Sequence, residues 1–313
     1  MLLLAAVVLM WPACSFSRGG ALATKSPGTF VYGQDPAASS PPETTNPPSD
    51  GTAPNRGSGS KPPVKRPAGS AGGSEANSSG SGTGGSFPTF SEFGALGSAV
   101  CSLVRPGQFQ KVNIEIDYVS GRAPSELAVS SLAASLKEVT GKSVGLAGGN
   151  AVTASGDGKW SNEEIKGLSE QRTVRTDTSS ITLWVGFLDG SHSLGSHIVG
   201  SALGATTMVI FPDRYGAASG NLLSHDEVER TVLVHEAGHV LALLNIGFQS
   251  PRPHEDPDHK GHSKNRDSVM YYAVDTTDIG RIFTGTPPYQ FDADDKADLA
   301  DIAAGRITTG TCG

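Results

Sequence analysis

Beyond about residue 90, apolar and polar positions follow patterns that predict strands and helices. They alternate over Val112–Val119, which is typical of a strand with one buried face. Ile181–Leu188 and Thr207–Phe211 are nearly continuous apolar runs that predict buried strands, and Ser143–Leu146 predicts a shorter one. Apolar residues at helical spacing predict a helix over Ser125–Val139.

The most strongly marked helix begins at Ser224. Ser224 and Glu227 have the spacing of a capping box, and apolar residues and histidines then recur every three or four positions. Asn245, followed by a glycine two residues later, predicts the C-terminal end of this helix. The order strand, helix, strand, strand, helix favours one α+β domain over residues 89–313.

The first 88 residues differ in composition from the rest of the chain. Leu2–Trp11 is an uninterrupted apolar run, too short to span a bilayer as a mature helix but placed where a signal peptide carries its apolar region. We therefore interpret residues 1–24 as a signal peptide or a lipoprotein signal, with a buried N-terminal strand as the alternative. Residues 25–88 are rich in Pro, Ser and Gly and have too few apolar residues to form a core, so they predict a disordered linker.

The three cysteines gain meaning if the chain is exported. Cys14 follows the apolar run and a small residue, as in a bacterial lipoprotein cleavage site, where the cysteine is lipidated and attaches the protein to a membrane. Cys101 and Cys312 then remain as a pair near the two ends of the folded region, and an oxidising compartment favours a disulfide between them. Two separate buried thiols are the alternative. We expect a secreted or cell-surface protein, either free or lipid-anchored.

The charge of the chain excludes one class of partner. The net charge is −7 at pH 7, and no basic stripe interrupts it. Proteins that bind nucleic acids neutralise rows of phosphates with clustered Lys and Arg, so we expect no nucleic-acid partner. Like the first segment, the other apolar runs are too short to span a membrane as a helix.

The predicted helix from Ser224 contains the sequence His-Glu-Ala-Gly-His. His235 and His239 are four residues apart, so both rings project from one face of the helix and can bind one metal ion. Two neutral imidazoles form most of a catalytic Zn²⁺ ligand set and leave room for a third ligand and a water. Glu236 lies on the adjacent edge, where it can take a proton from that water. An ordinary buried helix is the alternative, but three polar side chains in so apolar a run would be costly without a partner.

The segment after this helix carries a family resemblance. Together with the helix, the sequence Asp-Ser-Val-Met-Tyr-Tyr ending at Tyr272 resembles the metzincin clan of zinc peptidases, in which a turn containing a methionine lies beneath the metal. Met270 matches the methionine of that turn. Tyr272 matches a tyrosine that some members place beside the zinc, where it stabilises the oxyanion.

The third metal ligand departs from the common form of the motif. Where the clan has a glycine and then a third ligand, this chain has Ala242 and Asn245, and Asn is a poor zinc ligand. His254, His259 and His262 remain as candidates. Archaemetzincin-like peptidases have the pattern His-Cys-x4-Cys-x-Met, and this chain keeps its spacing from His262 to Met270, with Ser263 and Ser268 in place of the cysteines. The resemblance therefore favours His262, with His254 as the alternative.

The resemblance also implies a fold, an activity and a substrate. It implies a metzincin-like (zincin) catalytic domain with a mixed twisted sheet, a substrate-binding edge strand near Gly200–Ala205 and a C-terminal helix opening within Phe291–Leu299. One Zn²⁺ and Glu236 as general base would hydrolyse peptide bonds of a protein or peptide, and we expect a monomeric endopeptidase. The loop His254–His259 has the side chains to bind Ca²⁺ or a second Zn²⁺, although we interpret it as a solvated polar loop.

Two other functions remain open at this point. A surface-tethered binding or adhesion module could keep a zinc-site fold without turnover, but such decayed enzymes commonly lose the general base, and Glu236 is present. A purely structural zinc site would need a fourth protein ligand, for which the loop offers His254, Asp258 and His259.

Overall fold

The computed structural model describes residues 91–107, 109–220 and 222–309, all of which lie in one compact unit. The predicted signal segment with Cys14, the predicted linker and Cys312 lie outside the described residues. Within the described ranges, no helix is long and apolar enough to cross a membrane.

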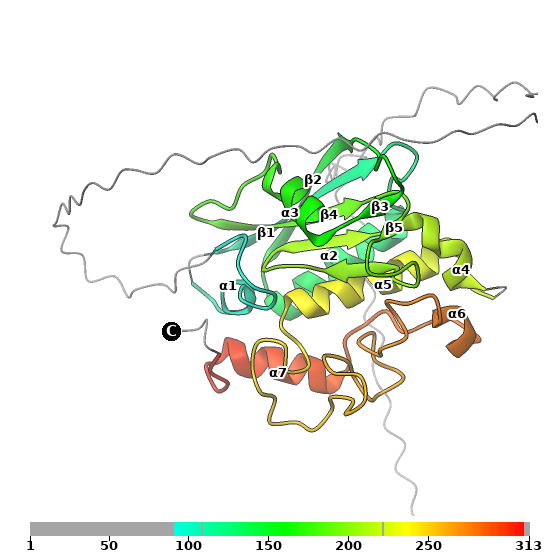
Figure 1. The fold of residues 1–313 in the computed structure, drawn as a ribbon. Coiled ribbons are helices and arrows are strands. Elements are labelled where there is room, and N and C mark those ends of the chain that lie inside the picture. The colour runs from blue at the N-terminus through cyan, green and yellow to red at the C-terminus, as the bar shows by residue number, and fades with distance from the viewer. Residues whose placement is uncertain (1–90, 108, 221, 310–313) are drawn as a thin grey trace, which may run out of the picture. The chain divides into compact units, whose positions relative to one another are not determined.

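A five-stranded sheet forms the centre of the fold (Figure 1). Its order is β2-β1-β4-β7-β6, and all neighbouring strands are parallel except β6, which runs antiparallel to β7 at one edge. The strands are β1 (Lys111–Val119), β2 (Ser143–Val152), β4 (Ser180–Phe187), β6 (Gly200–Ala202) and β7 (Thr207–Ile210). Two short strands, β3 (Lys159–Trp160) and β5 (Ser191–His192), form a separate parallel pair.

Helices cover both faces of the sheet. In β4, Leu183 and Val185 face a large core shared with α2 and α5, whereas Trp184 faces a smaller core shared with α3. Figure 1 shows α2 and α5 together on one side of the strands. The helices are α1 (Val100–Val104), α2 (Glu126–Thr140), α3 (Asn162–Glu170), α4 (Tyr215–Ser219), α5 (His225–Val240), α6 (Ile279–Ile282) and α7 (Ala293–Ala303), with a 3₁₀ turn at Pro212–Arg214.

Most of the predicted elements are confirmed, and the fold class is refined. The three longer predicted strands correspond to β1, β4 and β7, and the predicted C-terminal helix is α7. The predicted strand at Ser143–Leu146 is ten residues long. The sheet is mixed, as predicted, but it is mainly parallel and its early strands alternate with helices, so the architecture is a mixed α/β fold rather than α+β. The continuous apolar run of β4 is the signature of a parallel strand that is buried on both faces.

The predicted end of the helix that begins after Ser224 is wrong by five residues. Helix α5 ends at Val240, where the N–H of Leu243 donates to the carbonyl of Gly238 and that of Ala242 donates to His239. This pair of bonds is a Schellman motif, in which Ala242 takes the left-handed position that glycine usually occupies, with φ 62°. Because alanine hides this stop signal, the sequence pattern appeared to continue to Asn245.

The N- and C-terminal parts of the described chain meet beside Cys101. Cys101 in α1 is buried, and its Sγ lies 3.2 Å from Oγ1 of Thr309, three residues before Cys312. A Cys101–Cys312 disulfide remains a prediction, since Cys312 is not among the described residues.

We expect both thiols to resist alkylation in exported, unreduced protein. The bond would close a loop of roughly 200 residues, for which chain entropy predicts a stabilisation of about 5 kcal/mol at most. Intact mass after alkylation, with and without reduction, measures the pairing. Two alkylated thiols in the unreduced sample would exclude the bond.

Candidate metal centre

Helix α5 begins at a fully formed capping box. The backbone N–H of Glu227 donates to Oγ of Ser224 (3.2 Å), and the N–H of Ser224 donates to Oε2 of Glu227 (2.9 Å). From Thr231 to Val240 every residue of the helix is buried. His235, Glu236 and His239 therefore lie inside the protein, as the apolar run around them predicts.

The two helical histidines face each other as neutral bases. Their Nε2 atoms are 3.0 Å apart. Burial, with a further contribution from neighbouring histidines, lowers the pKa of His235 and of His239 to about 3, so both rings are uncharged at pH 7. Nδ1 of His235 donates to the carbonyl of Val269 (2.7 Å), which leaves the lone pair on its Nε2, pointing toward His239.

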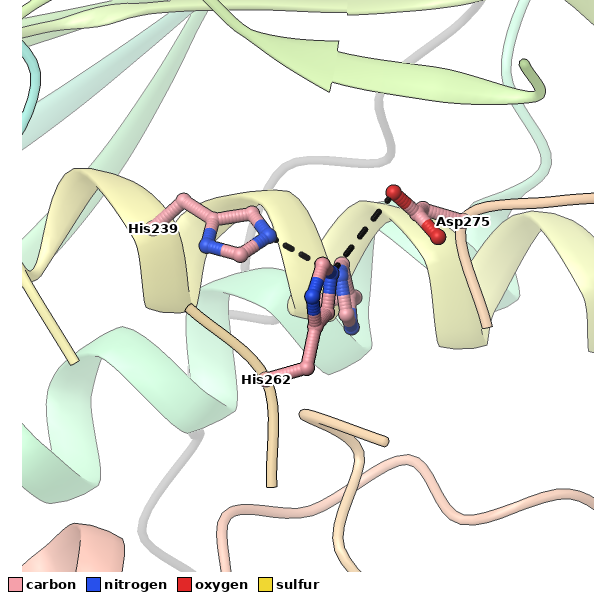
Figure 2. A group of neighbouring side chains, drawn as sticks. His239, His262 and Asp275 are labelled. Carbon is pink, nitrogen blue, oxygen red and sulfur yellow. Dashed lines mark hydrogen bonds and ion pairs between the residues drawn. The ribbon is translucent and has the colours of Figure 1, made fainter. Parts of the chain in front are cut away.

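His262 and Asp275 complete the group, as Figure 2 shows. The His262 ring centroid lies 5.3 Å from that of His235 and 5.1 Å from that of His239. Oδ2 of Asp275 is 3.8 Å from Nε2 of His262. One ligand atom from each of these four residues lies within 4.8 Å of every other, which is close enough to hold one metal ion. The sequence contains no signal that marks Asp275, because it follows the motif in a loop of unpredictable path.

Unpartnered polar atoms support a cation at this place. Nε2 of His262, Oε1 of Glu236 and Oδ1 of Asp275 are buried and have no hydrogen-bond partner among the described residues. Buried polar groups are normally satisfied, so three such atoms in one group require an explanation. A bound metal ion would supply one, and the residues present fit such an ion.

Glu236 lies between the histidines and the edge strand β6. Its side chain is 1% exposed, and burial, together with the negative charge of Asp275, raises its pKa well above the ordinary value. Strand β6 passes directly over it, because a Cβ added to Gly200 would lie 2.7 Å from Oε1 of Glu236. Only glycine allows the strand to approach the carboxylate this closely.

An open cavity of about 440 Å³ leads to this group. Glu236, His239 and Asp275 form part of its wall. The remaining wall comes from β6, from the chain just beyond α5 and from the loop before His262, namely Leu96, Ile198, Gly200, Ser201, Ala202, Leu244, Asn245, Ile246, Glu255, Lys260 and Gly261. The metal group is thus accessible to a ligand larger than water.

The turn containing Met270 packs beneath α5. Met270 is fully buried, and its amide donates to Oγ of Ser268 (3.0 Å). A Cβ added to Gly238 would lie 2.1 Å from Sδ of Met270. The glycine between the two helical histidines is therefore required by the turn below it, and the Val269 carbonyl of the same turn orients His235.

We expect Gly238→Ala to destabilise the metal-free protein by about 1–2 kcal/mol, because overpacking against Met270 outweighs the helix propensity of about 1 kcal/mol that alanine adds. Gly167→Ala in α3 is the matched control, since a Cβ there meets no atom within 4 Å. It should stabilise by about 1 kcal/mol. Urea denaturation measures both, and equal effects of the same sign would exclude the packing argument.

Comparisons with known proteins find only distant likenesses. No family model and no curated protein matches the sequence. Among solved structures, the chain is similar to archaemetzincin from Methanopyrus kandleri (TM-score 0.41, 18% identity, 64% of this chain and 99% of that chain). It is also similar to archaemetzincin from Archaeoglobus fulgidus complexed with malonate (0.35, 18%, 59% and 99%) and to a zinc-dependent peptidase from Methanocorpusculum labreanum (0.39, 14%, 59% and 99%). Because these identities and TM-scores are low, what the site can bind is inferred from the residues of this chain alone.

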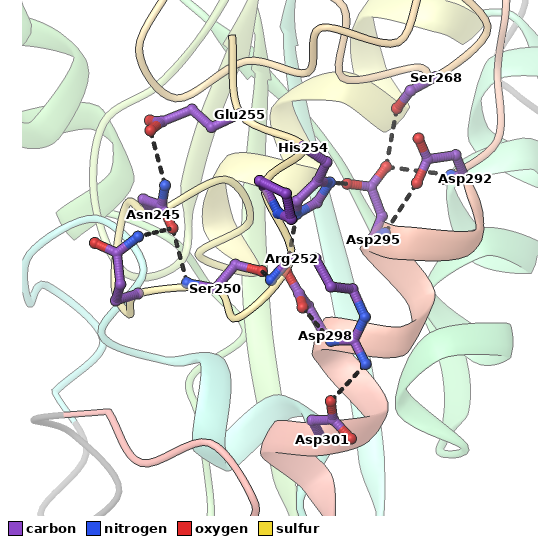
Figure 3. Close-up of polar contacts among 12 residues, drawn as sticks. Asn245, Ser250, Arg252, His254, Glu255, Ser268, Asp292, Asp295, Asp298 and Asp301 are labelled. Carbon is purple, nitrogen blue, oxygen red and sulfur yellow. Dashed lines mark hydrogen bonds and ion pairs between the residues drawn. The ribbon is translucent and has the colours of Figure 1, made fainter. Parts of the chain in front are cut away.

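His254, the alternative third ligand, lies in a different group. It is 3% exposed, so the expectation of a solvated loop is wrong for this residue. Its Nε2 is 2.9 Å from Oδ2 of Asp298 and its Nδ1 is 3.6 Å from Oδ1 of Asp295 (Figure 3). Asp295 accepts from Oγ of Ser268 (2.9 Å), so this network joins the loop and the Met270 turn to α7. With Asp292, His254 and Asp295 form the second group able to hold a cation among the described residues.

His259, the remaining candidate for the third ligand, contacts Tyr272, the candidate oxyanion residue. His259 is an exposed residue whose Nδ1 lies 2.9 Å from Oδ2 of Asp256. The Tyr272 ring stacks on the His259 ring with centroids 3.6 Å apart and planes 4° apart. Tyr272 is thus held at the loop that ends in His262, and its role at an oxyanion remains a prediction.

Proposed function

We propose that this protein is a zinc-dependent peptidase in which His235, His239 and His262 hold one Zn²⁺ and Glu236 is the general base. The observation that carries the proposal is the convergence of three imidazoles, two buried and one half-buried, beside a buried glutamate at the end of an open cavity. Three protein nitrogen ligands with an accessible further position are typical of catalytic rather than structural zinc sites. Ca²⁺ prefers oxygen ligands and fits this group poorly.

The metal and Glu236 would divide the chemistry between them. When bound, Zn²⁺ lowers the pKa of a water to about 7 and polarises the carbonyl that is attacked. In the metal-free protein burial raises the pKa of Glu236 well above its ordinary value, whereas a neighbouring divalent cation favours the carboxylate. The carboxylate then accepts the proton of the attacking water and delivers it to the leaving amine.

Strand β6 offers an edge for the substrate. At one end the N–H of Val199 donates to the carbonyl of Asp275, and at the other the N–H of Ala205 donates to Gly94, each at 2.9 Å. Between them, Gly200–Ala202 pairs with β7 on one side and has no strand partner among the described residues on the other. An extended peptide can pair antiparallel with this edge, which brings a carbonyl over the metal group. This arrangement supports cleavage within a chain, as an endopeptidase requires.

Other features of the proposal follow from the metzincin resemblance. We include the Met270 turn as the methionine turn beneath the metal, and Tyr272 as the residue that stabilises the oxyanion. Export by the N-terminal segment, with Cys14 as a possible lipid anchor and residues 25–88 as a linker, would place the enzyme at or beyond the cell surface as a monomer.

The proposal is tested by incubating the purified chain with a denatured protein. We expect cleavage that stops when a chelator removes the metal and returns when Zn²⁺ is restored. A zinc-loaded protein that binds peptides without cleaving them would instead be a binding or adhesion module. Cleavage that is unchanged by complete removal of metal would contradict the proposal.

A further inference from the structure

Asp275 faces the three histidines from outside the motif. Its Oδ2 is 3.8 Å from Nε2 of His262, and its Oδ1 is buried without a hydrogen-bond partner among the described residues. Nδ1 of His262 lies 3.2 Å from the carbonyl of Lys260, to which it donates, so Nε2 is the ring nitrogen that remains to bind a cation or a second proton. With a neutral ring, the lone pair of Nε2 faces a carboxylate oxygen, which is unfavourable unless a cation lies between them.

The backbone holds Asp275 in this position. Its carbonyl accepts from the N–H of Val199, the N–H of Thr277 donates to the carbonyl of His197, and Ile198 and Thr276 form an antiparallel bridge. The side chain of Asp275 is 25% exposed, compared with 53% for Asp278 on the same loop. The segment before β6 thus fixes the acid beside the metal group, and no Lys or Arg in the described chain forms an ion pair with it.

The spacing of the four side chains suits a closed metal site. In a tetrahedral zinc site with bonds of about 2.0–2.1 Å, neighbouring ligand atoms are about 3.3 Å apart. Four ligand atoms make six pairs, all within 4.8 Å, and two of them, His235 with His239 and His262 with Asp275, are 3.0 Å and 3.8 Å apart. These two distances lie within about half an ångström of the tetrahedral value.

We propose that Asp275 is the fourth protein ligand of the zinc ion in the resting enzyme, and that water takes its place when a substrate enters. The inference rests on the proposed function, because it concerns the same ion. Four protein ligands leave no position for water, as in structural zinc sites. The open cavity and the adjacent Glu236 distinguish this site from a structural one. Neither could act on a metal-bound water if Asp275 stayed bound to the metal throughout.

The experiment compares the full-length chain with Asp275→Ala, Asp275→Asn and, as a matched control on the same loop, Asp278→Asn. Zinc affinity is measured by competition with a chromogenic chelator, and the site is observed through the visible absorption of the Co²⁺-loaded proteins. We expect both Asp275 variants to lose more than about 100-fold in zinc affinity, because the loss of even an outer partner of a ligand costs 10–100-fold. Their Co²⁺ bands should change, and acetohydroxamate should bind at least about tenfold more tightly, since it displaces no protein ligand.

The outcomes separate this inference from the proposed function. Wild-type zinc affinity and an unchanged Co²⁺ spectrum in both Asp275 variants would overturn the role of Asp275 while leaving the peptidase proposal intact. If zinc affinity and the Co²⁺ spectrum are unchanged but the KM for peptides with a free amino terminus is raised, Asp275 binds the substrate instead of the metal. A wild-type chain that binds no zinc would overturn both proposals. Asp275→Asn keeps the size of the side chain, so it gives an answer even if Asp275→Ala fails to fold.

Discussion

Glu236→Ala is expected to lower the turnover of a protein substrate by about 10²- to 10⁴-fold while one zinc stays bound, because a positioned general base contributes a factor of that size. Glu236 lies beside the three histidines but forms no part of the histidine set, so its loss removes proton transfer without removing a nitrogen ligand. Turnover is measured on metal-loaded protein at several pH values, and bound zinc is measured in the same samples.

Glu227→Ala is the matched control for this experiment. Glu227 belongs to the same helix but lies at its N-terminal cap, away from the histidine group, so its loss should cost about 1 kcal/mol of stability and leave the turnover of the folded protein unchanged. Wild-type turnover by a zinc-loaded Glu236→Ala protein would remove Glu236 from the mechanism.

His262→Ala and His254→Ala are expected to have opposite effects. His262→Ala should abolish tight zinc binding and activity, because two histidines make a weak and poorly oriented site, but it should change the stability of the metal-free protein little. His254→Ala should keep about one zinc per chain and destabilise the fold by about 1.5–3 kcal/mol, because it removes a buried hydrogen bond to the carboxylate of Asp298, which keeps its ion pair with Arg252. Metal content and urea denaturation of both variants provide the measurements.

His259→Ala serves as the control, since this exposed residue belongs to neither group. If His262→Ala holds zinc like the wild type and His254→Ala does not, the assignment of the third ligand is wrong.

The elements that position the metal group could be predicted because local signals determine them. Three capping boxes, at Ser161, Ser224 and Asp292, begin helices where a Ser or Asp is followed three residues later by an acidic residue. The four-residue spacing of His235 and His239 requires only that the helix exists. The buried strands show the apolar runs that their burial demands.

Other features depend on contacts that a sequence pattern does not contain. The extent of β2 was missed because this glycine-rich edge strand has many exposed residues and no alternation of buried and exposed positions. The end of α5 was missed because Ala242 takes the left-handed backbone conformation. This conformation costs residues other than glycine about 1–2 kcal/mol, so an alanine is not expected there. That His262 reaches the metal group while His254 reaches α7 depends on the path of an irregular loop. Asp275 is placed by pairing with the segment before β6.

The close packing of Met270 against Gly238 also affects how this protein responds to oxidants. The thioether has no exposed surface, and the helix backbone leaves no space beside the sulfur for an added oxygen atom. Peroxide therefore reaches Met270 only when the turn opens, and the bulkier, polar sulfoxide formed at that moment does not fit when the turn closes again. We expect oxidation at this one atom to displace the turn from beneath α5, and with it the Val269 carbonyl that orients His235.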